Sequence, residues 1–447
     1  MKKIRIGSGA GYAGDRLEPS LELIEHGALD YICYECLAER TIAIAQQARL
    51  KDPSKGYNAL LEYRMNAALP LAHKHGVKII TNMGAANPLA AVEVVKRIAR
   101  DKGISGIKIA AVYGDDVFPR IDEYRGAAVW ETGEPLERLA GEIVSANAYL
   151  GCEGIVEALK RGADVVITGR VSDPALFIAP LVYEFGWKPD DWDRLGKGTV
   201  IGHLLECGGQ ATGGYFADPG KKDVPEPWRL GFPLIEADEN GDAFITKVVG
   251  SGGVVTTDTC KEQLIYEIHD PSTYITPDVT ADFSRVSFTQ SGKDVVEIRG
   301  ATGRARTDTL KVSIGYKDCF IGEGEISYGG PNCVERARLA REIVRRRLEL
   351  RAVPTDELRM DIVGVDSLYR NDAAPLPSSP SEARLRVAAR TKTREAAAAI
   401  GNEVETLYTN GPAGGGGATA TVQEIISVAS ILIPRADAEA VVAVEEV

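Results

Sequence analysis

The segment "HLLEC" brings three reactive side chains within one helical turn. His203, Glu206 and Cys207 stand at positions i, i+3 and i+4, so a helix would place an imidazole, a carboxyl group and a thiol on one face. Three kinds of chemistry remain open. The imidazole can withdraw the thiol proton to make a nucleophile, the group can bind a metal that takes a further ligand from elsewhere, or the Glu–His pair can act as general acid and base.

The same segment leads into the loop "GGQATGG", in which Gln210 offers an amide to a substrate. A purely structural interpretation makes the polar groups of the helix end the caps of this loop. The other four histidines show no ligand spacing such as H-x-x-x-H, so we predict no metal site.

A glycine-rich stretch, "GSGAGYAGDR" (7–16), follows a short apolar strand. Glycine can adopt positive φ values that turn several amides toward one anion. The stretch satisfies the dinucleotide motif G-x-G-x-x-G, and Glu35 ends the next predicted strand, where an acid can meet a ribose. The motif positions, which we also predict to bind substrate, are Gly9, Gly11 and Gly14.

Pro19 argues against a dinucleotide site, because it would lie inside the helix that such a motif opens. A helix that begins at or just before Pro19 fits better. The glycines then form a longer loop from which Asp15 and Arg16 project. Asp15 can accept a proton and Arg16 can bind a carboxylate or phosphate, or the two form a structural ion pair.

The first half of the chain alternates apolar strands with amphipathic helices, which indicates a parallel α/β sheet. Ligands bind such sheets beyond the carboxyl ends of the strands. Polar residues gather there, and from them we predict Asn82, Arg170 and Asp173 as binding residues. The predicted strands include 2–6, 29–35, 77–83, 107–114 and 163–169, and the predicted helices are 19–26, 37–49, 58–75, 88–102 and 136–160.

The later part of the chain changes character. A β-rich stretch holds a hairpin with Asn240-Gly241 at its turn, and residues 309–433 read β-α-β-β-α-β. We therefore predict an α/β fold class: a mostly parallel sheet with flanking helices, a β-rich segment and a C-terminal α+β domain of ferredoxin-like type. The predicted domains are 1–225, 226–305 and 306–447.

Further binding residues are predicted in this part. Asp258 stands at a predicted helix N-terminus, and Lys311 lies among apolar residues of a strand, where it must reach solvent, pair with Asp308 or serve a ligand. The segment "GPAGGGGA" (411–418) is predicted to be flexible, as a loop that wraps an anionic group of a ligand, a lid or a subunit contact. Asn410, Gly414 and Gly415 are predicted to bind substrate there. We expect this segment to face the first half of the chain.

Composition narrows the class of protein. The net charge of −12 and a pI near 5.2 argue against nucleic acid and anionic membranes as partners. The seven cysteines are scattered and odd in number, which is typical of reduced thiols in the cytoplasm. Cys33 and Cys36 form one C-x-x-C pair, which we place in a buried strand. No apolar run approaches the roughly 18 residues of a membrane span.

Motifs along nearly the whole chain resemble the acyclic terpene utilisation protein A (AtuA) family. The segments are "GSGAGYAGDRLEPS", "ANAYLG", "ADVVITGRVSDPAL", "GHLLECGGQATGGYF", "SGGVVTTDTCKEQLIYEI", "DTLKVSIGY" and "LYTNGPAGGGGA". The resemblance implies a place in the breakdown of branched acids as coenzyme A thioesters, with coenzyme A as part of the substrate. Longer members carry a small C-terminal domain, so a small partner protein is expected here.

Three functions follow from these residues. The first is a hydratase or related lyase acting on a branched carboxylate or its thioester, with His203 or Glu206 as base. The second is an NAD(P)-dependent oxidoreductase, and the third is a non-catalytic subunit that needs a small partner. We expect a homo-oligomer, and we expect glycine-lined turns from both halves of the chain to grip a small anionic molecule.

Overall fold

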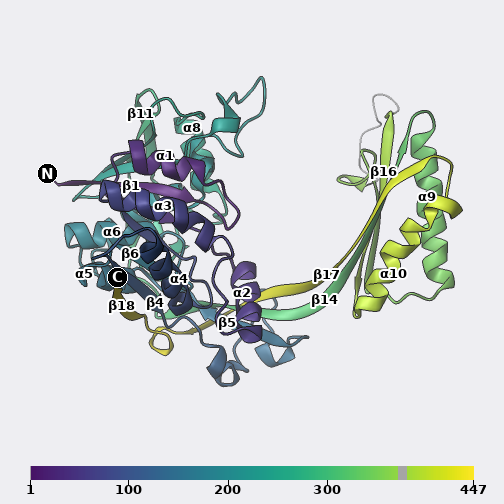
Figure 1. Cartoon of the computed structure of the whole chain (residues 1–447), viewed down its shortest axis with the longest axis horizontal. Helices are drawn as coiled ribbons and strands as arrows, with labels where there is room; N and C mark the ends of the chain where they lie inside the picture. Colours follow the sequence, from purple (N-terminus) through teal and green to yellow (C-terminus); the bar gives the residue numbers. More distant parts are fainter. Residues whose placement is uncertain (1, 371–379) are drawn as a thin grey trace. The chain divides into compact units, whose positions relative to one another are not determined.

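The computed structural model describes residues 2–370 and 380–447 (Figure 1). The chain forms two compact units. The first comprises Met1–Leu139, Ile143–Gly315 and Val428–Val447, and the second comprises Ala140–Glu142 and Tyr316–Ser427. Within the described ranges, no helix is long and apolar enough to cross a membrane.

The first unit is built on a ten-stranded mixed sheet of order β11-β12-β8-β7-β1-β2-β3-β6-β4-β18. Its five central strands run parallel and are almost wholly buried, which explains their continuous apolar sequences. They are β1 (Lys3–Ala10), β2 (Tyr31–Tyr34), β3 (Lys78–Thr81), β6 (Val165–Thr168) and β4 (Lys108–Tyr113). The prediction of parallel strands is confirmed for this central part.

Helices cover both faces of this sheet, as adjacent residues of β2 show. Ile32 packs into the core formed with α1 (Glu18–His26), α3 (Leu61–His75) and α4 (Pro88–Asp101). Its neighbour Cys33 points the other way, because its thiol donates to the carbonyl of Leu176 in α6 (Ala175–Phe185). The next helix, α7 (Trp192–Glu206), packs beside α6 and also contacts β1. The α2 helix spans Glu39–Lys51.

Antiparallel strands extend the sheet at both edges. On one side lie β7 (Pro233–Asp238), β8 (Ala243–Lys247), β12 (Val295–Arg299) and β11 (Ser287–Gly292), and on the other lies β18 (Val441–Glu446). The predicted hairpin between β7 and β8 is confirmed, and Gly241 takes the positive φ of 77° that its turn requires. Three short strands, β9 (Tyr274–Ile275), β10 (Thr280–Asp282) and β13 (Thr302–Arg304), form a separate sheet, and α8 spans Thr257–Ile265.

The prediction of one helix over 136–160 is wrong. This stretch holds a short 3-10 turn (Leu136–Arg138), strand β5 (Ile143–Ala148) and helix α5 (Glu153–Lys160). Gly141 has a φ of 130°, which interrupts a helix, and β5 pairs with β14 far along the chain. Pairing over that distance overrides the local helical pattern.

The second unit contains the predicted order of strands and helices. It runs β14 (Thr309–Gly329), α9 (Cys333–Leu350), β15 (Glu357–Val363), β16 (Glu382–Thr391), α10 (Arg394–Glu405), α11 (Leu407–Asn410) and β17 (Gly415–Pro434). The sheet order is β15-β16-β14-β17, with β5 paired to β14. Both long strands, β14 and β17, contribute residues to the two units.

Helix α9 packs on a different face from the one that Leu339 and Leu350 mark. The pattern of Leu339, Ile343 and Leu350 marks one side as apolar, yet Leu339 and Leu350 are 53% and 78% exposed. Smaller side chains at Ala337 and Val344 meet the sheet instead. Leu348 lies on this buried face as well, at 4% exposed, so the face that packs on the sheet combines small and large apolar side chains.

Candidate functional site

A cleft of about 770 Å³ lies in the first unit beyond the carboxyl ends of its parallel strands. It is lined by the loops after β1 and β2 and by the end of α7 with the loop that follows. Arg16 is the single arginine or lysine among the lining residues. Six carboxyl side chains line the cleft: Asp15, Glu35, Glu39, Asp173, Glu206 and Glu267. The cleft is therefore strongly acidic.

Glu206 and His203 form a buried pair at the end of α7. Nδ1 of His203 lies 2.8 Å from Oε1 of Glu206, and Nε2 lies 3.2 Å from the carbonyl oxygen of Leu264. The other carboxyl oxygen of Glu206, Oε2, has no hydrogen-bond partner although the residue is only 7% exposed. A buried oxygen without a donor is uncommon in folded proteins, and this one can accept a proton or a hydrogen bond from a molecule in the cleft.

The hydrogen bonds of His203 fix how many protons the pair holds. The carbonyl oxygen of Leu264 can only accept, so Nε2 of His203 carries a proton. The contact between Nδ1 and Oε1 needs one more proton, on either the imidazole or the carboxyl group. Burial raises the pKa of Glu206, and the Glu206 carboxylate raises the pKa of His203 against the opposing effect of burial. The pair thus stores one exchangeable proton at the cleft.

Cys207 is not activated by His203. Both imidazole nitrogens are engaged with Glu206 and Leu264, and burial raises the pKa of the Cys207 thiol far above its ordinary value. A protonated thiol is a poor nucleophile. Of the three kinds of chemistry open to "HLLEC", the geometry therefore favours a Glu–His acid–base pair.

Glu35 is a second buried carboxyl group of the cleft. Its Oε1 accepts hydrogen bonds from the backbone N–H of Leu37 at 2.9 Å and from the amide of Asn82 at 2.9 Å. Burial, reinforced by the nearby Asp173 carboxylate, raises the pKa of Glu35 well above its ordinary value. Glu35 can therefore carry a proton into the pH range where exposed carboxyl groups are ionised.

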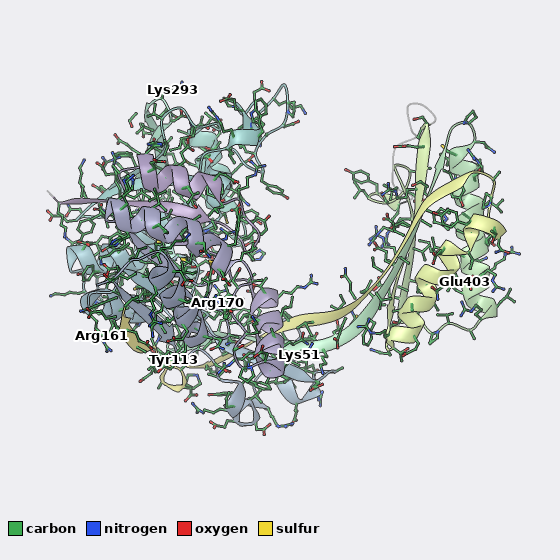
Figure 2. All side chains as sticks on the ribbon, in the orientation of Figure 1. Lys51, Tyr113, Arg161, Arg170, Lys293 and Glu403 are labelled. Carbon is green, nitrogen blue, oxygen red and sulfur yellow. The ribbon has the colours of Figure 1, made fainter. Side chains whose placement is uncertain are left out.

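Arg170 lies 1% exposed within the first unit (Figure 2) and compensates this concentration of carboxyl groups. Its guanidinium donates to the carbonyls of Leu37 and Val171 and pairs with Asp173 at the cleft. The ring of Tyr149 stacks on it, with 4.4 Å from the guanidinium carbon to the ring centroid. Arg170 thus ties the strand ends together beneath the cleft.

Tyr149 connects Arg170 to a second cation. Its hydroxyl donates to Glu39 at 2.5 Å, and the ammonium of Lys311 lies 3.1 Å from Glu39 and 4.9 Å from the Tyr149 ring. Burial opposes ionisation of Glu39, but the bond from Tyr149 and the charges of Lys311 and Arg170 outweigh it and lower its pKa to about 2. Glu39 is therefore ionised, in contrast to Glu35.

Comparison with known proteins places this site in a family. Residues 4–444 match the acyclic terpene utilisation family protein AtuA. The chain belongs to the AtuA family. No curated protein and no solved structure matches it. The predicted resemblance is therefore confirmed, and with it a connection to terpene utilisation.

The predicted site residues of this AtuA-family chain fall into three groups. The first lines the cleft: Gly11, Asp15, Arg16, Asp173, Glu206, Cys207 and Gln210. The second, comprising Asn82, Arg170 and His203, stands directly behind the lining and hydrogen-bonds to it. The third group does not line the cleft and comprises Gly9, Gly14, Asp258, Lys311, Asn410, Gly414 and Gly415. No described group of three or more His, Cys, Asp or Glu side chains is arranged to hold a metal ion.

Close packing explains the opening glycines of this family member. None of the motif glycines has a positive φ, so the expected fan of left-handed amides does not form. A Cβ at Gly9 would lie 2.6 Å from the Tyr34 ring, and one at Gly11 would lie 2.3 Å from the backbone carbon of Cys207. The Asp15 carboxylate accepts from the N–H of Gly11 and of Arg16. These contacts account for the motif without a dinucleotide.

Arg16 and Gly14 stand at the outer part of the loop. The guanidinium of Arg16 reaches the carbonyls of Pro227 and Trp228 at 3.5 and 3.3 Å, so the structural Asp15–Arg16 side-chain pair is not formed. Gly14 is exposed. The helix start predicted near Pro19 is confirmed, because Pro19 occupies the first turn of α1.

The remaining predicted residues lie outside the cleft lining. Asp258 is exposed and pairs with Lys261, while Thr256 and Thr259 cap α8. Lys311 pairs with Glu39 rather than Asp308. Gly415 begins strand β17 against Tyr328, so part of the predicted flexible glycine loop is regular structure. Asn410, Gly414 and Gly415 all belong to the second unit, and their convergence with the first loop stays a prediction.

Several site residues were missed by sequence reasoning. Glu35 was predicted only as a ribose ligand, although its place after β2 is the signal that finds it. Glu39, Tyr149 and Glu267 carry no motif of their own, and Tyr149 meets Glu39 across 110 positions of sequence. Arg64, fully buried in α3, supports the opening loop by donating to the carbonyl of Asp15 at 2.8 Å.

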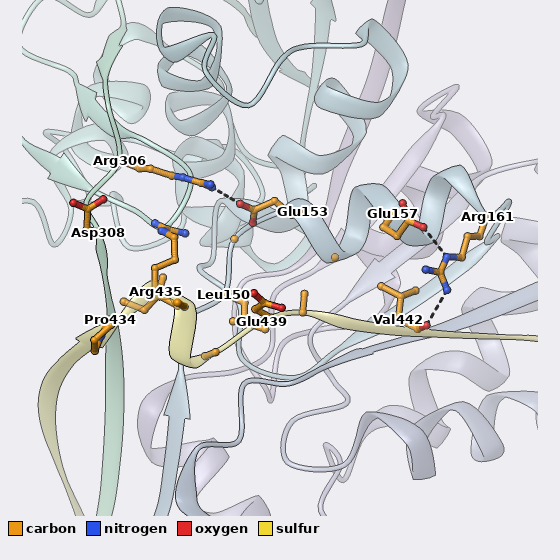
Figure 3. A pocket seen from close by; sticks show the side chains of 16 residues that line it. Leu150, Glu153, Glu157, Arg161, Arg306, Asp308, Pro434, Arg435, Glu439 and Val442 are labelled. Atoms are coloured by element: carbon orange, nitrogen blue, oxygen red, sulfur yellow. Dashed lines mark hydrogen bonds and ion pairs between the residues drawn. The ribbon is translucent and has the colours of Figure 1, made fainter. Parts of the chain in front are cut away.

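A second large cavity of the first unit is lined by arginines and by carboxyl groups, unlike the acidic cleft (Figure 3). It measures about 760 Å³ and contains Arg161, Arg306 and Arg435. Arg306 pairs with Glu153 and Arg161 pairs with Glu157, as the dashed lines in Figure 3 show. The guanidinium charges there are largely neutralised, so this cavity is a weaker candidate for the reactive site.

Proposed function

We propose that this protein is a catabolic enzyme that performs acid–base chemistry on a branched acyl coenzyme A thioester, in a reaction of the hydratase or lyase type. The observation that carries the proposal is the Glu206–His203 pair, with one exchangeable proton, one unpartnered carboxyl oxygen and a place in the cleft wall. The family's link to terpene utilisation supports branched substrates.

The charge of the cleft favours a thioester over a free carboxylate. Six carboxyl side chains line it, and the cations behind them, Arg170 and Lys311, already pair with Asp173 and Glu39. Arg16 is then the one lining cation left for a carboxylate at the reacting position. A thioester carbonyl is uncharged, and it acidifies the neighbouring C–H bond. The amide of Gln210 lines the same cleft and can donate to the carbonyl oxygen as negative charge develops there.

The two buried carboxyl groups divide the work of eliminating water. Glu206, backed by His203, accepts the proton from the carbon next to the carbonyl. Glu35, whose pKa burial raises well above its ordinary value, gives a proton to the departing hydroxyl group, which leaves as water. One proton is taken and one is given, so the net charge of the cleft does not change. The starting state returns when the proton on Glu206 is transferred to the Glu35 carboxylate.

Other properties are proposed on narrower grounds. The second unit has the sheet order β15-β16-β14-β17. Along the chain, a helix connects β14 to β15 and two helices connect β16 to β17, which supports a ferredoxin-like fold. We propose a cytoplasmic location from the cysteine content, and a homo-oligomer or a small partner protein from the exposed strand edges and the family resemblance.

Hydrogen exchange at carbon tests the reaction without knowledge of the product. In D₂O the protein should introduce deuterium next to the carbonyl of isovaleryl- or citronellyl-coenzyme A, as followed by mass spectrometry. Glu206→Gln should slow this exchange by about a hundredfold or more. Glu262→Gln is the matched control, because Glu262 pairs with Lys222 outside the cleft lining. Unchanged exchange in Glu206→Gln, or none with any branched thioester, would contradict the proposal.

A further inference from the structure

We infer that a separate apolar cavity of the first unit binds the hydrocarbon chain of an acyl ligand whose reacting end lies in the acidic cleft. The cavity measures about 450 Å³. Asp173 lines both spaces, and Tyr149, which lines the cavity, donates to Glu39 of the cleft. The inference rests on the proposed function for the identity of the reacting end, but the chain site stands on its own observations.

Exposed apolar side chains gather around this cavity. Trp130 is 75% exposed, Ile275 58% and Leu432 44%, and all three line it although they come from distant parts of the sequence. Large apolar side chains left in water and brought together by the fold mark a binding surface. Such a surface gains most from an apolar ligand.

Most polar groups of the lining already have partners within the protein. Glu131 accepts the N–H of Ser430 at 2.9 Å, the hydroxyl of Thr276 donates to Val279 at 2.9 Å, and Lys311 pairs with Glu39. A polar ligand would find few free partners among them. The body of the ligand in this space must therefore be apolar.

Ser172 is the exception that points to a ligand. It lines the cavity, is 6% exposed, and its hydroxyl has no hydrogen-bond partner. Buried hydroxyl groups are rarely left unpaired. One oxygen on the ligand, next to Asp173 that also lines the cleft, would satisfy it, as a thioester or hydroxyl group on the first carbons of the chain can do.

Chain-length dependence of binding tests the inference. Neutral S-acyl-N-acetylcysteamine thioesters with butyryl, hexanoyl and octanoyl chains are titrated by calorimetry into Glu206→Gln protein, which lacks the proposed base. We expect the Kd to fall about two- to fourfold for each added methylene. Trp130→Ala and Leu432→Glu should flatten this dependence, whereas Trp228→Ala, equally exposed at 75% but outside the cavity, should not.

The outcomes separate the two proposals. A Kd that does not change with chain length, or a dependence that survives in both cavity variants, overturns the chain site whatever the reaction. A chain-length dependence that the cavity variants remove supports the chain site even when wild-type protein exchanges no deuterium. The corresponding free acids, from butyrate to octanoate, serve as a second arm. The same dependence with these acids also supports the chain site, while equally tight binding of the acids would weaken the preference for thioesters.

Discussion

Two buried glutamates, one in each unit, show opposite ways to hold a carboxyl group out of water. Glu403 on α10 is 4% exposed, and its two oxygens pair with Arg351 at 2.7 Å and Arg347 at 3.3 Å (Figure 2). Glu206 on α7 is 7% exposed, but it has one histidine partner and one oxygen with none. Each residue stands near the end of its helix.

The difference separates structure from chemistry. Two arginines pair with the two oxygens of Glu403, and these ion pairs join the end of α9 to α10. Glu206 shares an exchangeable proton with His203 and has one oxygen without a partner, which costs stability. A role in a reaction would explain why the protein retains such a group. A half-partnered carboxyl group in a cleft is therefore stronger evidence of function than burial alone.

Substitution of Arg170, a buried cation that pairs with a carboxylate, should cause the largest loss of stability. Arg170→Met removes the bonds to Leu37 and Val171 and the ion pair with Asp173, and it leaves the nearby carboxyl groups uncompensated. We expect a loss of about 3–5 kcal/mol in the free energy of unfolding, measured by urea denaturation at neutral pH. A loss below 1 kcal/mol would show that Arg170 is not the compensating charge.

The sequence predicted the site best where chemistry follows local structure. The spacing of His203 and Glu206 on a helix predicted that their side chains meet, and the rule for strand ends predicted that Asp15, Arg170 and Asp173 lie around one rim. Contacts between distant segments could not be predicted from the sequence. Glu39 with Tyr149, and Glu403 with Arg351, meet only through the fold, and β5 forms because β14 pairs with it.

The two glutamates should respond oppositely to the same substitution. Glu403→Gln leaves Arg347 and Arg351 without a carboxylate and should lower the free energy of unfolding by about 1–2 kcal/mol, since both guanidinium groups reach solvent. Glu206→Gln keeps a hydrogen-bond partner for His203 and should leave stability within about 0.5 kcal/mol of wild type. Denaturation of both variants at neutral pH checks this, and equal losses would remove the distinction.

Glu35 should give the smallest effect, visible in the pH dependence of stability. Its pKa is raised in the folded protein above the ordinary 4.5, so the folded state keeps a proton that the unfolded chain releases. Stability from this group therefore falls as the pH rises above about 4.5 toward the folded pKa.

Glu35→Gln removes that titration while keeping an oxygen for the bonds from Leu37 and Asn82. The variant should become more stable than wild type, by about 1 kcal/mol, as the pH is raised from about 5 to about 8. Thermal unfolding across this range provides the measurement. A difference that does not grow as the pH rises would mean that Glu35 is ionised in the folded protein across this range.

A crystal structure with an inert thioether analogue of a branched acyl coenzyme A would test the central claim most directly, because it locates the reacting carbon. We predict that this carbon lies beside the carboxyl group of Glu206, with the acyl chain passing Asp173 into the apolar cavity. An analogue whose acyl end lies in the arginine-containing cavity of Figure 3, away from Glu206, would contradict the account.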